Sequence, residues 1–385
     1  MPSRGSASPP RFRTRVIVAA AIALYLVIEG FSLAELRLLE RRGVRFDPRP
    51  SVLTENQKDT LSQFLSRGHA TGMGFDPVLG WTKALTPTIE SIRQIAETNS
   101  AGMRDDQEYA PFPAAGITRI EAFGDSFTYC RDVRLAECWA KRIPEMAPRV
   151  EVLNYGVGAY GLDQAYLRYL KVGATYHPHI VFIGYMTENF QRDVNVFRAF
   201  YSDAYPDWIF SKPRFQLQSG RLALLKNPLS SFEDYQRLVQ NPAQVLAELG
   251  RNDFHYQMSY GQGPLDSLPS VRLAKIAWAT AKKQVLYPLL DREGVYNPNS
   301  EAYQVTEKIF DAFYRKVLED GALPIIVIFP NTTDQQRNRD RKPRCYAPLL
   351  KHFNAEQYRF VDLLNAFQPY QSRYQLQDLL GLSSS

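Results

Sequence analysis

Three short segments of the chain carry residue types that could form a hydrolytic site. Each contains a polar or glycine residue directly after an apolar stretch, and these residues are Ser126, Gly156 and Asn189. A serine hydroxyl can attack an ester carbonyl, and backbone or amide N–H groups can stabilise the oxyanion that forms. The competing interpretation is that Asp125 and Ser126 only cap the helix that follows them.

The stretches before these residues are typical of strands in an α/β protein. Strands are predicted at 117–123, 150–154, 180–186, 323–329 and 358–362. Helices are predicted between them, at 162–172 and 301–319. Apolar strands that alternate with helices indicate a parallel sheet covered on both faces, so we expect a three-layer α/β/α sandwich. The carboxyl ends of its strands would meet at one edge, where ligands bind.

Residues 120–128, which read Ile-Glu-Ala-Phe-Gly-Asp-Ser-Phe-Thr, resemble the first sequence block of the SGNH/GDSL hydrolase superfamily. Residues 99–105 are similar to the segment that precedes this block in many exported members. The resemblance covers roughly 76–362, with a loose match over 190–290. It implies a flavodoxin-like sheet and a serine esterase that uses no metal or organic cofactor. We expect an ester substrate, with an O-acylated carbohydrate as one candidate.

The resemblance also implies roles for single residues. Ser126 would be the nucleophile, and its own N–H would contribute to the oxyanion hole. Gly156 would supply a second N–H, because a glycine allows the close backbone approach that a Cβ would prevent. Asn189 would supply a side-chain N–H, although the spacing from Gly184 to Asn189 departs from the family's usual Gly-x-Asn-Asp block. Other glycines that fit in a shifted register are Gly158 and Gly161.

The catalytic Asp and His are not identified. In the family they form a final Asp-x-x-His block, but the nearest candidate here, Asp378, is followed by no histidine. Three explanations stay open: the sequence lacks the C-terminus of a longer protein, a histidine of the 190–290 region such as His255 acts instead, or the protein binds acylated ligands without turnover. The functional alternatives are therefore an O-acyltransferase on a surface polysaccharide and a non-catalytic anchored binding protein.

The N-terminus reads as a membrane segment. We place the segment at 16–35; within 16–34 the only charged residue is Glu29, which we place near the far interface. Four arginines precede this segment and would stay in the cytoplasm, so the rest of the chain would lie outside it, in the periplasm or at the cell surface. A cleaved signal peptide is the main rival, with Ser32 and Ala34 as small residues before the cut. A buried core helix is the third interpretation.

Composition and spacing complete the domain prediction. The net charge is +6, and four of those charges are arginines of the first fifteen residues, so no nucleic-acid-binding domain is indicated. We expect a basic tail at 1–15, the anchor at 16–35, a stalk and lead-in at 36–115, and a hydrolase domain at 116–385. The region 190–290 would be an insertion in that domain, with a hairpin at 213–224.

The cysteines and histidines indicate no metal site. Cys130 and Cys138 are close in sequence and could form a disulfide outside the cytoplasm. Neither the three cysteines nor the five histidines have metal-ligand spacing, which disfavours a zinc hydrolase.

Overall fold

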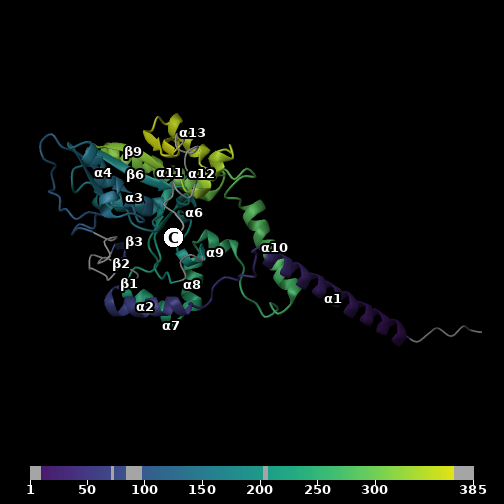
Figure 1. The fold of residues 1–385 in the computed structure, drawn as a ribbon. Coiled ribbons are helices and arrows are strands. Elements are labelled where there is room, and N and C mark those ends of the chain that lie inside the picture. The colour runs from purple at the N-terminus through teal and green to yellow at the C-terminus, as the bar shows by residue number, and fades with distance from the viewer. Residues whose placement is uncertain (1–9, 71–72, 84–97, 203–206, 368–385) are drawn as a thin grey trace, which may run out of the picture. The chain divides into compact units, whose positions relative to one another are not determined.

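The computed structural model describes residues 10–70, 73–83, 98–202 and 207–367. The chain divides into two compact units. We call Met1–Arg49 together with Met258–Tyr287 the anchor unit, and Pro50–Gln257 together with Pro288–Ser385 the sheet unit. Figure 1 labels the elements of both.

The sheet unit is built on five parallel strands in the order β10-β9-β6-β4-β5. Their bounds are β4 (Thr118–Phe123), β5 (Val150–Asn154), β6 (Ile180–Met186), β9 (Leu323–Phe329) and β10 (Phe360–Asp362). All five predicted strands are therefore confirmed, with the last one beginning two residues later than expected. Crossovers through helices are what parallel pairing requires, since a tight turn cannot return the chain to the same end of the sheet.

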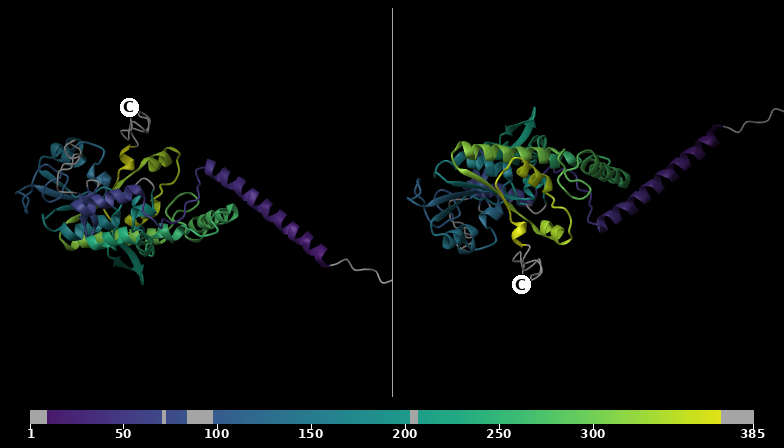
Figure 2. Two further views of the ribbon diagram at one scale, coloured as in Figure 1. Left: turned by 90° about the horizontal axis from the view of Figure 1, so that it is seen from below. Right: turned by 90° about the horizontal axis from the view of Figure 1, so that it is seen from above.

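Helices cover both faces of this sheet. On one face, Phe123 and Ile183 pack in the main core with α5 (Leu162–Val172) and α11 (Glu301–Glu319). On the other face, Ile120 and Val152 pack with α4 (Trp139–Met146). The observed bounds of α5 and α11 match the predicted helices, and the predicted layered α/β class with a parallel sheet is confirmed (Figure 2).

The lead-in to the sheet is part of the core rather than a stalk alone. It contains α2 (Glu55–Arg67) and a three-stranded sheet of β1 (His69–Ala70), β2 (Met73–Asp76) and β3 (Gly80–Lys83). Leu61, Phe64, Trp81 and Met103 are buried in the same cluster as the strands of the large sheet. The sequence pattern concealed this because these apolar residues are spaced irregularly among turns.

The insertion contains the predicted hairpin and several helices. Strands β7 (Arg214–Gln218) and β8 (Arg221–Leu225) pair antiparallel around Ser219 and Gly220, which both have positive φ. Two-residue turns of this kind need that conformation, which glycine adopts without strain. The insertion's helices are α6 (Asn189–Arg192), α7 (Phe232–Gln240), α8 (Pro242–Gly250) and α9 (Phe254–Met258).

The remaining helices of the sheet unit are short. Beside the sheet lie α3 (Ser126–Tyr129), α12 (Thr332–Arg339), α13 (Ala347–Ala355) and α14 (Leu364–Phe367). Two 3₁₀ turns occur at Leu135–Glu137 and Arg198–Phe200.

The anchor unit contains two helices in contact, α1 (Pro10–Arg41) and α10 (Pro269–Ala281), and α10 continues into a π-helical turn at Lys282–Leu286. Helix α1 is long and apolar enough over Thr14–Arg41 to cross a membrane. It contains the whole predicted segment 16–35. A cleaved signal sequence passes the same test of length and composition.

Candidate active site

The strand order places the three candidate segments side by side. Strand β4 lies between β6 and β5, and all three are parallel, so the loops after them leave from the same edge. The loop with Ser126 is the central one, flanked by the loop with Gly156 and by the loop with Asn189. This edge is where open parallel sheets bind ligands.

Ser126 is the first residue of α3, and Asp125 caps that helix. The Oδ1 atom of Asp125 accepts a hydrogen bond of 2.9 Å from the N–H of Phe127. The capping interpretation is thus correct for Asp125, but it leaves the Ser126 side chain uncommitted. The Ser126 hydroxyl is partly exposed and makes no hydrogen bond to another described residue.

Two glycines let α3 lie close against the sheet. A Cβ at Gly124 would stand 2.8 Å from the Thr128 Cβ, and a Cβ at Gly184 would collide with the Thr128 hydroxyl. Contacts this short do not occur between real side chains. Gly124, directly after β4, and Gly184, in β6, are therefore needed so that Thr128 can pack between them. Thr128 lies two residues after Ser126.

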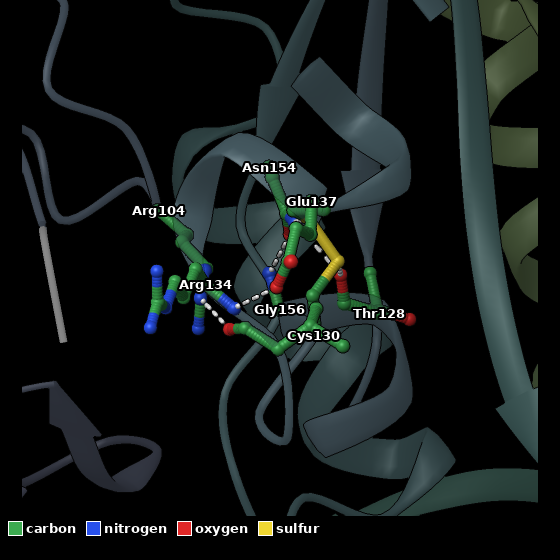
Figure 3. Close-up of a disulfide and its surroundings, with 9 residues drawn as sticks. Arg104, Thr128, Cys130, Arg134, Glu137, Asn154 and Gly156 are labelled. Atoms are coloured by element: carbon green, nitrogen blue, oxygen red, sulfur yellow. Dashed lines mark hydrogen bonds between the residues drawn. A yellow bond between two sulfur atoms is a disulfide. The ribbon is translucent and has the colours of Figure 1, made fainter. Parts of the chain in front are cut away.

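Asn154 supports the far end of α3 (Figure 3). Its Nδ2 donates to the carbonyl of Thr128 at 2.7 Å, and its Oδ1 accepts from the N–H of Gly156 at 2.9 Å. A disulfide joins Cys130, the residue that ends α3, to Cys138, which precedes α4. Helix α3 is thus held in place by the hydrogen bonds of the Asn154 amide and by the disulfide.

Gly156 has a packing role that differs from the expected one. A Cβ at this position would stand 2.8 Å from the carbonyl carbon of Thr128 and 2.8 Å from the Tyr129 Cα. The expectation of a close backbone approach therefore describes the contact with α3. The N–H of Gly156 is directed at Asn154, because the Asn154 amide bridges the two segments, so it is not available to an oxyanion in this arrangement.

The next residues of the same loop have uncommitted N–H groups. Val157 donates its N–H to the carbonyl of Gly124 at 3.0 Å, which ties the loop to the segment before Ser126. No described residue accepts a hydrogen bond from the N–H of Gly158 or Ala159. Ala159 has φ of 64°, a left-handed conformation that is uncommon for residues with a side chain. The remaining register alternative, Gly161, donates its N–H to the Gln164 side chain at 3.2 Å.

Asn189 is buried at the start of α6, and its amide donor is unsatisfied. Its Nδ2 makes no hydrogen bond of normal geometry to any described residue, while its Oδ1 accepts from Arg192 at 3.3 Å. Buried amide donors without a partner are rare, because each costs about 1–3 kcal/mol. The amide also lies close enough to Asp125 to act on that carboxyl's pKa.

Arg192 connects the three loops. Its Nη1 donates to the carbonyl of Tyr160 at 3.0 Å and lies 3.6 Å from Asp125 Oδ2, and its Nη2 lies 3.3 Å from Glu188. The side chain is almost wholly buried, so these charges are poorly screened by water. The positive charge of the Arg192 guanidinium is therefore buried next to the loop that carries Ser126.

The two carboxyl groups near this cation differ in pKa. Burial raises the pKa of Asp125, and the charge of Arg192 only partly offsets it. Burial also acts to raise the pKa of Glu188, but the charge of Arg192 and the hydrogen bond from Tyr201 prevail, so the net pKa is lowered. Glu188 is therefore the ionised partner of Arg192, and Asp125 is the carboxyl more easily protonated.

Four of the five histidines have contacts that account for them elsewhere. The Nδ1 atom of His179 accepts from the N–H of Arg119 at 3.1 Å, at the amino edge of the sheet. His352 lies 2.7 Å from Asp311 of α11. The other two are in β1 or stacked on Phe112, and they are His69 and His177.

The fifth, His255, contacts the element that carries Asn189. Its Nε2 donates to the carbonyl of Gln191 in α6 at 3.1 Å, and its ring centroid lies 4.8 Å from that of Tyr201. Asp378, the aspartate considered from the sequence, lies outside the described residues.

No metal cluster is found in the described part of the chain: no three His, Cys, Asp or Glu side chains there could share an ion.

Sequence reasoning missed Arg192, Asn154 and Ala159. Arg192 follows Asn189 by three residues on α6, which is the helical spacing for neighbouring side chains and could have suggested the pair. Asn154 ends a predicted strand, but nothing in the sequence indicates that its amide bridges to α3. The positive φ of Ala159 has no sequence signal.

Comparison with known proteins gives weak similarity to solved structures only. No protein-family profile and no curated protein matches the sequence. One of the solved structures that match is assigned to the G-D-S-L family of lipolytic proteins and comes from Desulfitobacterium hafniense DCB-2. It is 13% identical, with a TM-score of 0.29, over 64% of this chain and 77% of that one. At this level of similarity the match supports no argument about residues.

Proposed function

We propose that this protein is a serine esterase of the SGNH/GDSL type, with Ser126 as its nucleophile. The observation that carries the proposal is an uncommitted serine hydroxyl on the central loop, next to a loop whose buried amide, Asn189 Nδ2, makes no hydrogen bond of normal geometry. This amide acts on the carboxyl of Asp125, the residue before Ser126, so it lies where a donor could serve a charge formed during reaction.

The oxyanion hole would combine three kinds of N–H group. The Ser126 N–H opens α3 and has no acceptor within the helix. Asn189 supplies the side-chain donor. For the third donor we replace Gly156 by the next loop residues, Gly158 and Ala159, whose N–H groups are uncommitted.

In the proposed reaction the Ser126 oxygen bonds to the acyl carbon of an ester while a base takes the hydroxyl proton. The alcohol then leaves with a proton, and an acyl-enzyme on Ser126 remains. Water resolves it to an acid in hydrolysis, whereas a sugar hydroxyl would resolve it to a new ester in acyl transfer. An O-acylated carbohydrate is our proposed substrate class.

We further propose that α1 anchors the protein with its N-terminus in the cytoplasm and its sheet unit outside. The arginines that precede residue 16 support this orientation. A disulfide between Cys130 and Cys138 also fits an oxidising compartment.

Labelling of the full-length protein in detergent with a fluorophosphonate probe tests the nucleophile. We expect labelling of the wild type and none of Ser126→Ala, while Ser66→Ala, an exposed serine at the end of α2, labels normally. Asn189→Ala should slow labelling about 100- to 1,000-fold, because it removes an oxyanion donor. Equal labelling of Ser126→Ala and wild type would refute the proposal.

The same assay locates the base. A large loss of labelling in His255→Gln would assign the proton transfer to the histidine that contacts α6. Normal labelling of His255→Gln would exclude this histidine as the base.

A non-catalytic binding protein is the second candidate. It is favoured by one observation: no histidine hydrogen-bonds to Ser126 within the described residues, and all five histidines are among them. Loss of the base lowers the rate of a serine hydrolase by several orders of magnitude. Binding of an O-acylated sugar to folded protein that never labels would support this candidate.

A further inference from the structure

One side of α1 is covered only in its second half. Residues 14–28 are exposed all round the helix, whereas Ser32 and Leu36 are buried and Glu29 is partly buried. These positions recur every three or four residues and form one stripe. Helix α10 packs against α1 within the anchor unit, near the C-terminal end of α1 (Figure 1).

A polar contact determines the position along α1 at which α10 begins. Both oxygens of Glu29 accept hydrogen bonds from Ser270, one from its N–H at 3.0 Å and one from its hydroxyl at 2.5 Å. The only acid among residues 16–34 is thereby satisfied by the first turn of α10. Because residues 14–28 are bare, α10 must run from this contact toward the C-terminal end of α1.

The composition of α10 and its extension is that of an interfacial helix. Between Asp266 and Asp291 the chain has four basic residues and no acid. Its exposed side chains include Trp278 and the run Val285, Leu286 and Tyr287. Aromatic residues and lysines on an exposed apolar helix are typical of the boundary between lipid tails and headgroups.

The positions of Glu29 along α1 and of Trp278 along α10 agree with a headgroup boundary near the end of the membrane segment. If the membrane segment ends at residue 35, Glu29 lies about 9 Å below the boundary, since a helix rises about 1.5 Å per residue. Trp278 follows Ser270 by eight residues and so lies about 12 Å further along α10, on the side of Glu29 toward that boundary. Lys282 and Lys283 would lie beyond it, at the level of the phosphates.

We infer that α10 is a second membrane contact, in which Trp278 sits at the outer headgroup boundary beside α1 and Lys282 and Lys283 face lipid phosphates. This inference rests on the proposed anchoring by α1 and is independent of the esterase proposal. Helix α10 would then contact the membrane surface beside α1.

Tryptophan quenching by brominated lipids in vesicles of phosphatidylcholine and phosphatidylglycerol tests the inference on the full-length protein. The chain has four tryptophans, and Trp278 is the one in the anchor unit. Phospholipids brominated near the headgroup end of their acyl chains should quench up to about a quarter of the wild-type emission. Trp278→Phe should abolish this quenching, and Trp139→Phe, the matched control in the sheet unit, should retain it.

Two results would overturn the inference. Equal lipid quenching of wild type and Trp278→Phe would exclude Trp278 from the boundary, as would emission that is quenched by aqueous acrylamide in wild type but not in Trp278→Phe. Release of the protein from the vesicles by alkaline carbonate would refute the anchor on which the inference rests. Fluorophosphonate labelling of Ser126 in the same samples reports the esterase proposal separately.

Discussion

Arg192 Nη1 lies 3.6 Å from Asp125 Oδ2, and both side chains are almost wholly buried. The contact joins the loop after β6 to the loop after β4, directly beside Ser126. Arg192 also pairs with Glu188, whose pKa is lowered, so removing the guanidinium would leave an ionised carboxyl of this cluster uncompensated.

Replacing Arg192 by methionine should therefore destabilise the protein by about 3–5 kcal/mol, as removal of one partner of a buried ion pair does. The loss would be measured by urea unfolding of the detergent-solubilised protein. Asp125→Asn keeps the helix cap, since asparagine caps as well as aspartate. The double variant Asp125→Asn, Arg192→Met should lose less than the sum of the single changes; strictly additive losses would show that the two groups are not coupled.

Gly156→Ala should disturb the serine's helix. Its Cβ would stand 2.8 Å from backbone atoms of Thr128 and Tyr129, so α3 has to move away from the loop. We expect a loss of stability of about 1–3 kcal/mol and slower fluorophosphonate labelling of Ser126. Gly261→Ala is the control, because a Cβ at that position would meet nothing within 4 Å. Similar effects of the two changes would contradict the packing role of Gly156.

Removing the disulfide should lower stability through the unfolded state. The bond closes a loop of eight residues, for which the chain-entropy relation gives about 2.5 kcal/mol. Unfolding of Cys130→Ser, Cys138→Ser would be compared with that of Cys345→Ser, a free cysteine that forms no loop. A loss in Cys345→Ser as large as in the double variant would show that the effect is not specific to the bond.

Glu121 should make stability depend on pH. It is buried in β4, neither carboxyl oxygen has a hydrogen-bond partner in the described residues, and burial raises its pKa to about 9 against the opposing charge of Arg119. Between the unfolded pKa near 4.5 and the folded pKa, the folded state binds one more proton, so this group lowers stability as pH rises.

Glu121→Gln removes that proton linkage. We expect the variant to gain on the order of 3 kcal/mol relative to wild type between pH 5 and pH 8, as followed by denaturant unfolding at both values. A stability difference between variant and wild type that is the same at the two pH values would mean that Glu121 titrates normally in the folded protein.

Much of the architecture could be predicted from local patterns. The apolar runs at 150–154 and 180–186 are strands, and the periodicity of 162–172 and 301–319 marks helices with the observed bounds. These predictions succeed because strands of a parallel sheet are buried on both faces and are therefore mostly apolar in sequence. The lead-in at 36–115 was harder, since Trp81 reaches the core from a strand of only four residues and Met103 from an irregular segment.

The sequence by itself determined which residues could act, because Ser126, the loop glycines and Asn189 each follow a strand whose pattern is local. Only the tertiary structure decided how their hydrogen bonds are shared. Gly156 donates to Asn154, Asn189 keeps an unsatisfied amide, and Arg192 joins three loops. The contacts of Asn154 with Thr128 and of Arg192 with Tyr160 and Asp125 depend on the strand order β6-β4-β5 and on close packing of α3, which bring together groups that are far apart in the chain. A hydrogen bond reaches only about 3 Å, so no pattern of nearest neighbours in the sequence encodes it.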